Sequence, residues 1–199
     1  MPFVFKRLAL FMSIAAAFAA DKEPSPFRAA PAASFANHQA NDGVTIGAEA
    51  YMSGDKVKAA FGKLDPYQWG ILPVLVVIQN DSAKAIRLEH LKVAYVGPNH
   101  DRVEATPARD VRYLHGPQQP GIVTGPAGRT KVIKVKKNPL GAWEIEGRAF
   151  AAQMLPPGQS ASGFYYFQTG LQRGATLYLS GLTEAASGKE LFYFELALQ

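Results

Sequence analysis

The residues best suited to ligand contact are aromatic side chains near the end of the chain and in its loops. Tyr178 and Tyr193 lie in two predicted strands, "GATLYLSGL" and "KELFYFELAL". Strand alternation predicts that both tyrosines face outward and that four other side chains face inward, namely Leu177, Leu179, Phe192 and Phe194. The two rings then form a flat platform for a sugar ring or a Pro-rich segment, or a cross-strand pair that only stabilises the sheet. Trp69 and Trp143, each near a glycine in or beside a loop, are alternative anchors.

A second candidate surface is the basic segment "GPAGRTKVIKVKK". It carries five cationic side chains, Arg129, Lys131, Lys134, Lys136 and Lys137. These side chains suit contact with an anionic polymer or a lipid surface. The alternative is a solvated edge strand whose lysines discourage pairing with another chain. Nucleic acid is not expected as a partner, because basic and aromatic residues do not interleave as in single-strand binders.

The chain offers no recognisable metal or catalytic motif. Its histidines, His38, His90, His100 and His115, have spacings that match no zinc motif, and cysteine is absent. Asp101 beside His100 and the many serines do not make a triad, because no G-x-S-x-G elbow is present. We therefore assign no catalytic residue, no metal ligand and no cofactor.

The first residues have the pattern of a secretory signal peptide. Lys6 and Arg7 precede a short apolar stretch over 8–18, and Ala17-Phe18-Ala19 is a small-x-small cleavage site. The apolar stretch is shorter than the roughly 20 residues that a membrane span needs. Loss of residues 1–19 lowers the formal net charge from +5 to +3, because both charged residues of this segment are basic. We expect an exported, periplasmic or extracellular protein with no transmembrane span after processing.

The remaining chain predicts one all-β domain. Residues 20–42 are rich in Ala and Pro and are expected to form a linker, which leaves 43–199 as a single domain. Ile71 to Ile78 form an apolar run without alternation, so both faces of this strand must be covered, as in the centre of a sandwich. "SGDKVKAAFG" has apolar residues at helical spacing and predicts a short helix. A Gly- and Pro-rich insertion at about 97–142 is either functional or loosely ordered.

The segments "FGK", "GILPVLVVIQNDSAKAIRL", "MLPPGQSASGFYYFQ" and "LTEAASGKELFYFEL" cover most of this domain. In them the chain resembles uncharacterised bacterial secreted proteins. The resemblance implies an immunoglobulin-like antiparallel β-sandwich with short helices and one long insertion. It implies no activity and no site residues.

These observations favour a non-catalytic secreted or periplasmic binding module, associated with the cell envelope, whose partner is a protein or glycan of that envelope. The alternative is a secreted hydrolase whose site is formed by the long insertion at the sandwich edge. The two differ in geometry, because a hydrolase needs titratable groups that meet in a cleft, whereas a binding module needs an exposed aromatic or apolar patch. The sequence leaves the oligomeric state open.

Export is predicted to remove the first 19 residues, because Ala17 and Ala19 satisfy the small-residue requirement of the cleavage site. Mass spectrometry of the protein recovered from the native compartment should find a chain that begins at Ala20. A chain that still begins at Met1 would contradict the signal peptide.

Overall fold

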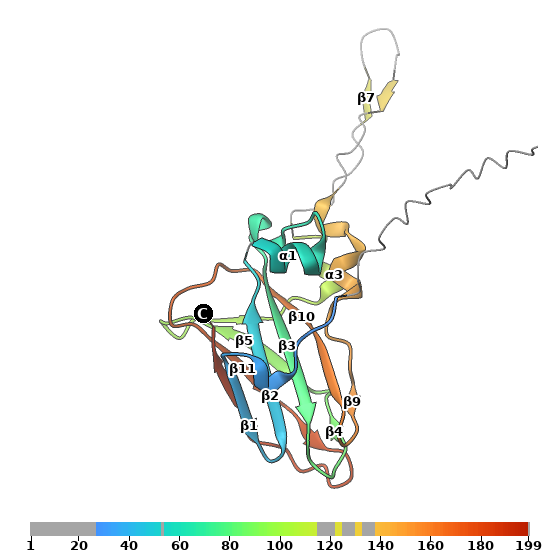
Figure 1. The fold of residues 1–199 in the computed structure, drawn as a ribbon. Coiled ribbons are helices and arrows are strands. Elements are labelled where there is room, and N and C mark those ends of the chain that lie inside the picture. The colour runs from blue at the N-terminus through green and yellow to red at the C-terminus, as the bar shows by residue number, and fades with distance from the viewer. Residues whose placement is uncertain (1–26, 53, 115–121, 125–129, 133–137, 199) are drawn as a thin grey trace, which may run out of the picture.

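The computed structural model describes residues 27–52, 54–114, 122–124, 130–132 and 138–198. These residues form mostly antiparallel β-sheets with a few short helices, which confirms the all-β class (Figure 1). None of the helices in this described part is long and apolar enough to cross a membrane.

Two four-stranded sheets pack face to face. The first sheet has the order β1 (His38–Asn41), β2 (Val44–Ala50), β3 (Leu72–Asn80) and β10 (Ser160–Phe167). The second sheet has the order β13 (Phe194–Ala197), β11 (Thr176–Ser180), β5 (Lys92–Val96) and β6 (Arg102–Glu104). The core between them contains alternate residues of both sheets, among them Val74, Val76, Tyr95, Leu177 and Phe194.

Smaller elements complete the fold. A three-stranded sheet has the order β12 (Thr183–Glu184), β4 (Ile86–Arg87) and β9 (Met154–Leu155), and β7 (Ile122–Thr124) pairs with β8 (Thr130–Val132). The helices are α1 (Gly54–Phe61), α2 (Ala108–Val111) and α3 (Trp143–Gly147), with 3₁₀ turns η1 (Ala32–Ser34), η2 (Pro66–Trp69) and η3 (Pro139–Gly141). Figure 1 shows α1 and α3 gathered at one end of the sheets.

Strand β3 is buried on both faces, as its apolar run predicts. Its even-numbered residues, such as Val76, face the second sheet, while Leu75 and Val77 belong to a separate core with Phe61 of α1 and Ile145 of α3. β3 lies between β2 and β10, so its backbone is also paired on both edges. The central position predicted for the run is confirmed, and its second cover is a layer of helices.

The linker predicted for 20–42 is wrong for its described residues. Ala32 and Phe35 are buried, and β1 pairs with β2 along its whole length. The turn η1 packs closely against β2 because β2 has a glycine at position 47, where a Cβ atom would lie 2.5 Å from the carbonyl oxygen of Ala32. The lack of an apolar period fits β1, an edge strand whose four residues are exposed or half-buried.

The insertion at about 97–142 is partly built into the sheets. β6 is the edge strand of the second sheet, and α2 buries Val111 in the core that also contains Phe61 of α1 and Ile145 of α3.

The inward position predicted for Phe192 is wrong. Phe192 and Tyr193 are both exposed, at 67% and 54%, because regular β13 pairing begins only at Phe194.

Asn80 fixes the end of β3. Its Nδ2 donates to the carbonyl oxygens of Lys84 and Leu155, at 2.7 and 2.9 Å, and its Oδ1 accepts from the backbone and hydroxyl of Ser82. The side chain is fully buried, yet every polar atom is satisfied. One amide therefore joins the turn after β3 to strand β9.

Val76→Asp should lower the free energy of unfolding by at least about 3 kcal/mol, because it places an unpaired charge between the two sheets. Ser160→Asp, at an exposed position of β10, is the matched control and should change it by less than about 0.5 kcal/mol. Urea unfolding of both variants measures the difference. Equal midpoints would contradict the buried central strand.

Asn80→Asp should destabilise the fold by about 2 kcal/mol or more, because a carboxylate oxygen then faces the carbonyl oxygens of Lys84 and Leu155 in a buried place. The control is Asp81→Asn, which makes the reverse exchange, carboxylate to amide, at the neighbouring exposed position. Thermal unfolding at neutral pH compares them. A wild-type melting temperature for Asn80→Asp would show that this amide does not hold the turn.

Candidate functional site

The structure brings Tyr178 and Tyr193 together on the outer face of the second sheet. Their ring centroids lie 5.3 Å apart and the ring planes are 26° from parallel. The Arg102 guanidinium lies 5.2 Å from the Tyr178 ring centroid. The sheet order places β13 and β6 on opposite sides of β11, so Tyr193 and Arg102 flank Tyr178 from its two sides.

This arrangement is a row of three stacked groups and not an open platform. Tyr178 is half-buried between its neighbours, which leaves Tyr193 as the more exposed of the two rings. Arg102 is also paired with Glu104 at 2.7 Å. Sequence reasoning found the tyrosine pair from strand parity but missed Arg102, since the edge strand that carries it lies inside the predicted insertion.

Trp69 and Trp143 line one cleft of about 760 Å³, although 73 residues separate them in the chain. They are 42% and 67% exposed. The volume lies within the roughly 300–1,000 Å³ range that is typical of small-molecule sites. The cleft therefore unites two anchors that the sequence predicts only as separate candidates.

Short capped turns place the two indoles. Asp65 Oδ1 accepts from the Tyr67 amide at 3.1 Å and caps η2, whose last residue is Trp69. Gly70, with φ of 73°, ends this turn in a left-handed conformation. On the other wall, Asn138 caps η3 through the Leu140 amide and donates to the Arg112 carbonyl, which fixes the chain that leads into Trp143.

The lining of this cleft combines apolar surface with a polar rim. The buried Phe61 side chain contributes to the apolar part. The rim holds both donors and acceptors, from Lys63, Asp65, Gln68, Asn138 and Glu144. This mixture suits a neutral ligand that has a flat apolar face and several hydroxyl or amide groups, because the indoles cover the face and the rim binds the polar groups.

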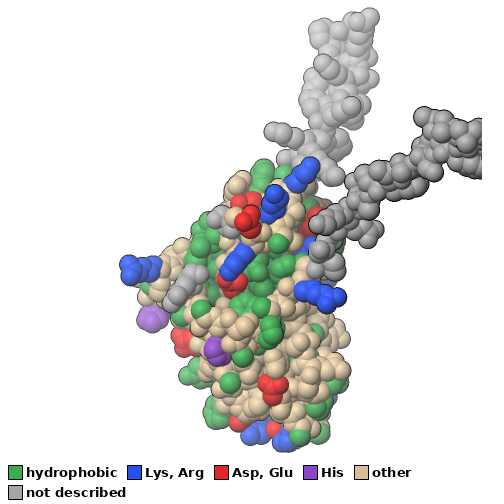
Figure 2. Space-filling model, in the orientation of Figure 1, with side chains coloured by type: hydrophobic (Ala, Val, Ile, Leu, Met, Phe, Trp, Pro, Cys, Tyr) green, Lys and Arg blue, Asp and Glu red, His purple; other side chains and the backbone are tan. Residues whose placement is uncertain are grey.

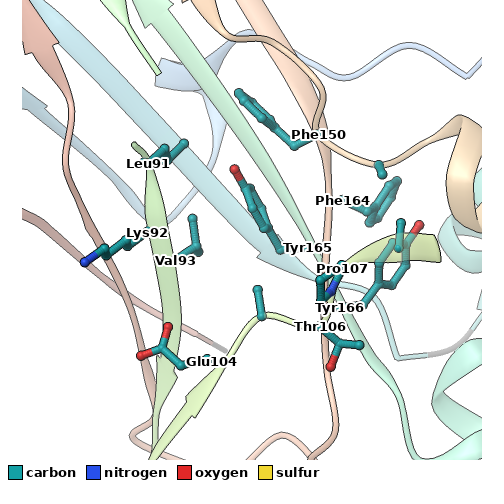
Figure 3. A pocket seen from close by; sticks show the side chains of 13 residues that line it. Leu91, Lys92, Val93, Glu104, Thr106, Pro107, Phe150, Phe164, Tyr165 and Tyr166 are labelled. Atoms are coloured by element: carbon teal, nitrogen blue, oxygen red, sulfur yellow. The ribbon is translucent and has the colours of Figure 1, made fainter. Parts of the chain in front are cut away.

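A second hollow, of about 350 Å³, is lined by residues of β5, of the chain at and after the end of β6, and of β10. Figure 3 shows Leu91 and Val93 on one side of it and Tyr165 and Phe150 on the other. The Phe150 and Tyr165 rings stack with centroids 5.5 Å apart. Burial raises the pKa of the Tyr165 phenol well above its usual value, so this group stays a neutral hydrogen-bond donor.

This edge hollow is where a site formed by the insertion would lie, because residues 104–108 contribute to its wall. Its lining includes no serine, cysteine or histidine. Its polar side chains are those of Lys92, Glu104, Thr106 and the two tyrosines, and the Thr106 hydroxyl accepts from the Gln168 amide at 3.3 Å.

The remaining candidates do not form a site in the described residues. The His38 Nδ1 atom lies 2.7 Å from the Phe35 carbonyl oxygen, His90 and His100 are exposed, and His115 lies outside the described residues. No group of three or more potential metal ligands occurs in the part of the chain that the structure describes.

The basic segment predicted as a second surface is described only in part. Lys131 belongs to β8, whereas Arg129, Lys134, Lys136 and Lys137 lie outside the described residues. Figure 2 shows acidic and basic side chains interspersed over the face in view.

Comparison with known proteins gives no family for this chain. No protein-family model and no curated protein matches it. Among solved structures, it is similar to structural genomics target SoR45, with 12% identity, a TM-score of 0.33, and 78% of this chain and 86% of that chain covered. It is also similar to a DUF4426 family protein from Pseudomonas aeruginosa PAO1, with 9% identity, a TM-score of 0.32, and 80% and 90% covered. A third is a functionally unknown protein from Listeria monocytogenes EGD-e, with 9% identity, a TM-score of 0.35, and 80% and 79% covered. At these scores the similarities carry no argument about function.

Proposed function

We propose that the protein is a non-catalytic binding module of the cell envelope and that the cleft between Trp69 and Trp143 holds its ligand. The module is exported by the signal sequence over residues 1–19 and acts in the periplasm or outside the cell. Its scaffold is an immunoglobulin-like sandwich of the two main sheets, to which the helical layer adds the site. The chain has no cysteine, so no disulfide contributes to this scaffold.

The observation that carries the proposal is the position of the tryptophans. The chain has only two, and both line the same cleft. A large indole that is two-thirds exposed, as Trp143 is, leaves apolar surface in water that a ligand can cover. Aromatic anchors of this kind dominate the free energy of binding at many interfaces.

The proposed ligand is a neutral glycan segment. A sugar ring presents an apolar face of C–H groups to an indole and a belt of hydroxyl groups to the rim. The rim offers an amide or carboxylate acceptor at Asp65, Gln68, Asn138 and Glu144, and an ammonium donor at Lys63. The signs of these groups are mixed, so the cleft does not select a strongly charged ligand.

Intrinsic fluorescence tests the proposal directly, because every tryptophan of the chain reports on this cleft. Titration with neutral oligosaccharides, chitotriose and maltotriose among them, should give a saturable change in emission for at least one. Trp143→Ala should weaken that binding by about 1 to 3 kcal/mol, by analogy with the stacking of bases on aromatic side chains. Trp69→Phe should keep part of the affinity, because it preserves an aromatic ring.

Tyr193→Ala is the matched control, since it removes an exposed ring from the distant sheet face. It should leave the titration unchanged while the fold loses at most about 1 kcal/mol from the broken aromatic pair. Loss of binding in Tyr193→Ala with retention in Trp143→Ala would move the site to the tyrosine row. Absence of any saturable signal across the panel would reject the glycan proposal.

A further inference from the structure

Arg148 holds a guanidinium group that no described residue neutralises. Its backbone is fixed between α3 and β10, because its amide donates to carbonyl oxygens of α3 and its own carbonyl accepts from the Phe164 amide at 2.8 Å. The side chain takes part in none of the ion pairs formed by the described residues. Its Nε atom is buried and has no hydrogen-bond partner there.

Two aromatic rings hold this guanidinium in place. Its Cζ atom lies 5.1 Å from the ring centroid of Phe27 and 5.7 Å from that of Trp143. Stacking contacts of this kind restrict the plane of the guanidinium but use none of its N–H donors. The group is therefore oriented by its neighbours and keeps its hydrogen-bonding capacity for another molecule.

A hollow of about 280 Å³ lies beside Arg148. Its wall includes Ser162 and bare backbone at Gly147 and Gly163. A Cβ atom at Gly163 would lie 2.4 Å from the Cα atom of Phe150, and one at Gly147 would lie 2.8 Å from the Trp143 ring. These two glycines let β10 approach the Phe150 backbone and let the end of α3 contact the Trp143 ring.

We propose that this hollow binds the carboxylate of a small organic acid, with Arg148 as the cation and the Ser162 hydroxyl as a second donor. The planar fork of a guanidinium matches a carboxylate and can bind both of its oxygens. A dianionic phosphate fits less well, because the lining holds one arginine and no lysine. The Nη atoms of the guanidinium, which are not among the buried unpartnered atoms of the described residues, supply the N–H donors for this carboxylate. This proposal does not depend on a ligand in the tryptophan cleft.

The test uses the Trp69→Phe variant, in which Trp143 beside Arg148 is the only tryptophan. Sodium propionate is titrated at constant ionic strength, with sodium chloride and inorganic phosphate as comparison salts. Propionate should change the emission saturably and shift the Arg148 Nε–Hε resonance in a ¹H–¹⁵N spectrum. Chloride should give no saturable change, and phosphate should bind at least tenfold more weakly than propionate.

Arg148→Gln should abolish the response, and Ser162→Ala should weaken it about three- to tenfold. Arg173→Gln, which removes an exposed arginine elsewhere, should leave it unchanged. If Arg148→Gln does not fold, the test rests on two other measurements. These are the response of Ser162→Ala, which changes an exposed residue, and the shift of the Arg148 Nε–Hε resonance. An unshifted Arg148 resonance, an unchanged response in a folded Arg148→Gln variant, or phosphate binding as tight as propionate would overturn the assignment.

Discussion

The burial of β3 on both faces is the constraint from which the rest of the structure follows. A strand with apolar side chains on both sides needs two covers, and the second sheet supplies only one. The other cover is assembled from short pieces, namely the segment around Phe35 and the helices that carry Phe61, Val111 and Ile145. Each piece alone is too short to be stable in water, so the outer face of the first sheet holds them together.

The two proposed binding sites, the tryptophan cleft and the Arg148 hollow, belong to this second cover. The tryptophan cleft lies between the end of α1 with η2 and the chain from η3 into α3. Arg148 follows α3 directly and contacts Phe27 at the start of the described chain. The sheets themselves contribute mainly a rigid base, while capped turns and helix ends position the side chains that face solvent.

Sequence patterns predict the parts of the fold that depend on short-range periodicity. The unbroken apolar run correctly placed Val76 in a central strand, the helical spacing in 54–61 correctly predicted α1, and strand parity correctly brought Tyr178 and Tyr193 together. Parity failed at Phe192, because the chain is not yet a regular strand there. The linker prediction failed because the contact of Ala32 with Gly47 is a matter of missing side-chain volume, which no period reveals.

The sites depend on long-range contacts, and this is why the sequence predicted them only in part. Trp69 and Trp143 were recognised as anchors by residue type, but nothing in the local pattern indicates that they share one cleft. Arg148 carries no sequence signal at all. Its significance comes from the ring of Phe27, distant in the chain, from the ring of Trp143 five residues before it, and from its taking part in no ion pair of the described residues.

Amide hydrogen exchange of the full mature chain tests most directly whether the second cover is part of one cooperative fold. The account predicts that amides of β3 exchange most slowly and that those of β1, α1 and α3 are also strongly protected, because they unfold with the sheet that they cover. Protection of β3 together with exchange of α1 and α3 at the rate of an unstructured chain would contradict it. In that case neither the tryptophan cleft nor the Arg148 hollow would be preformed.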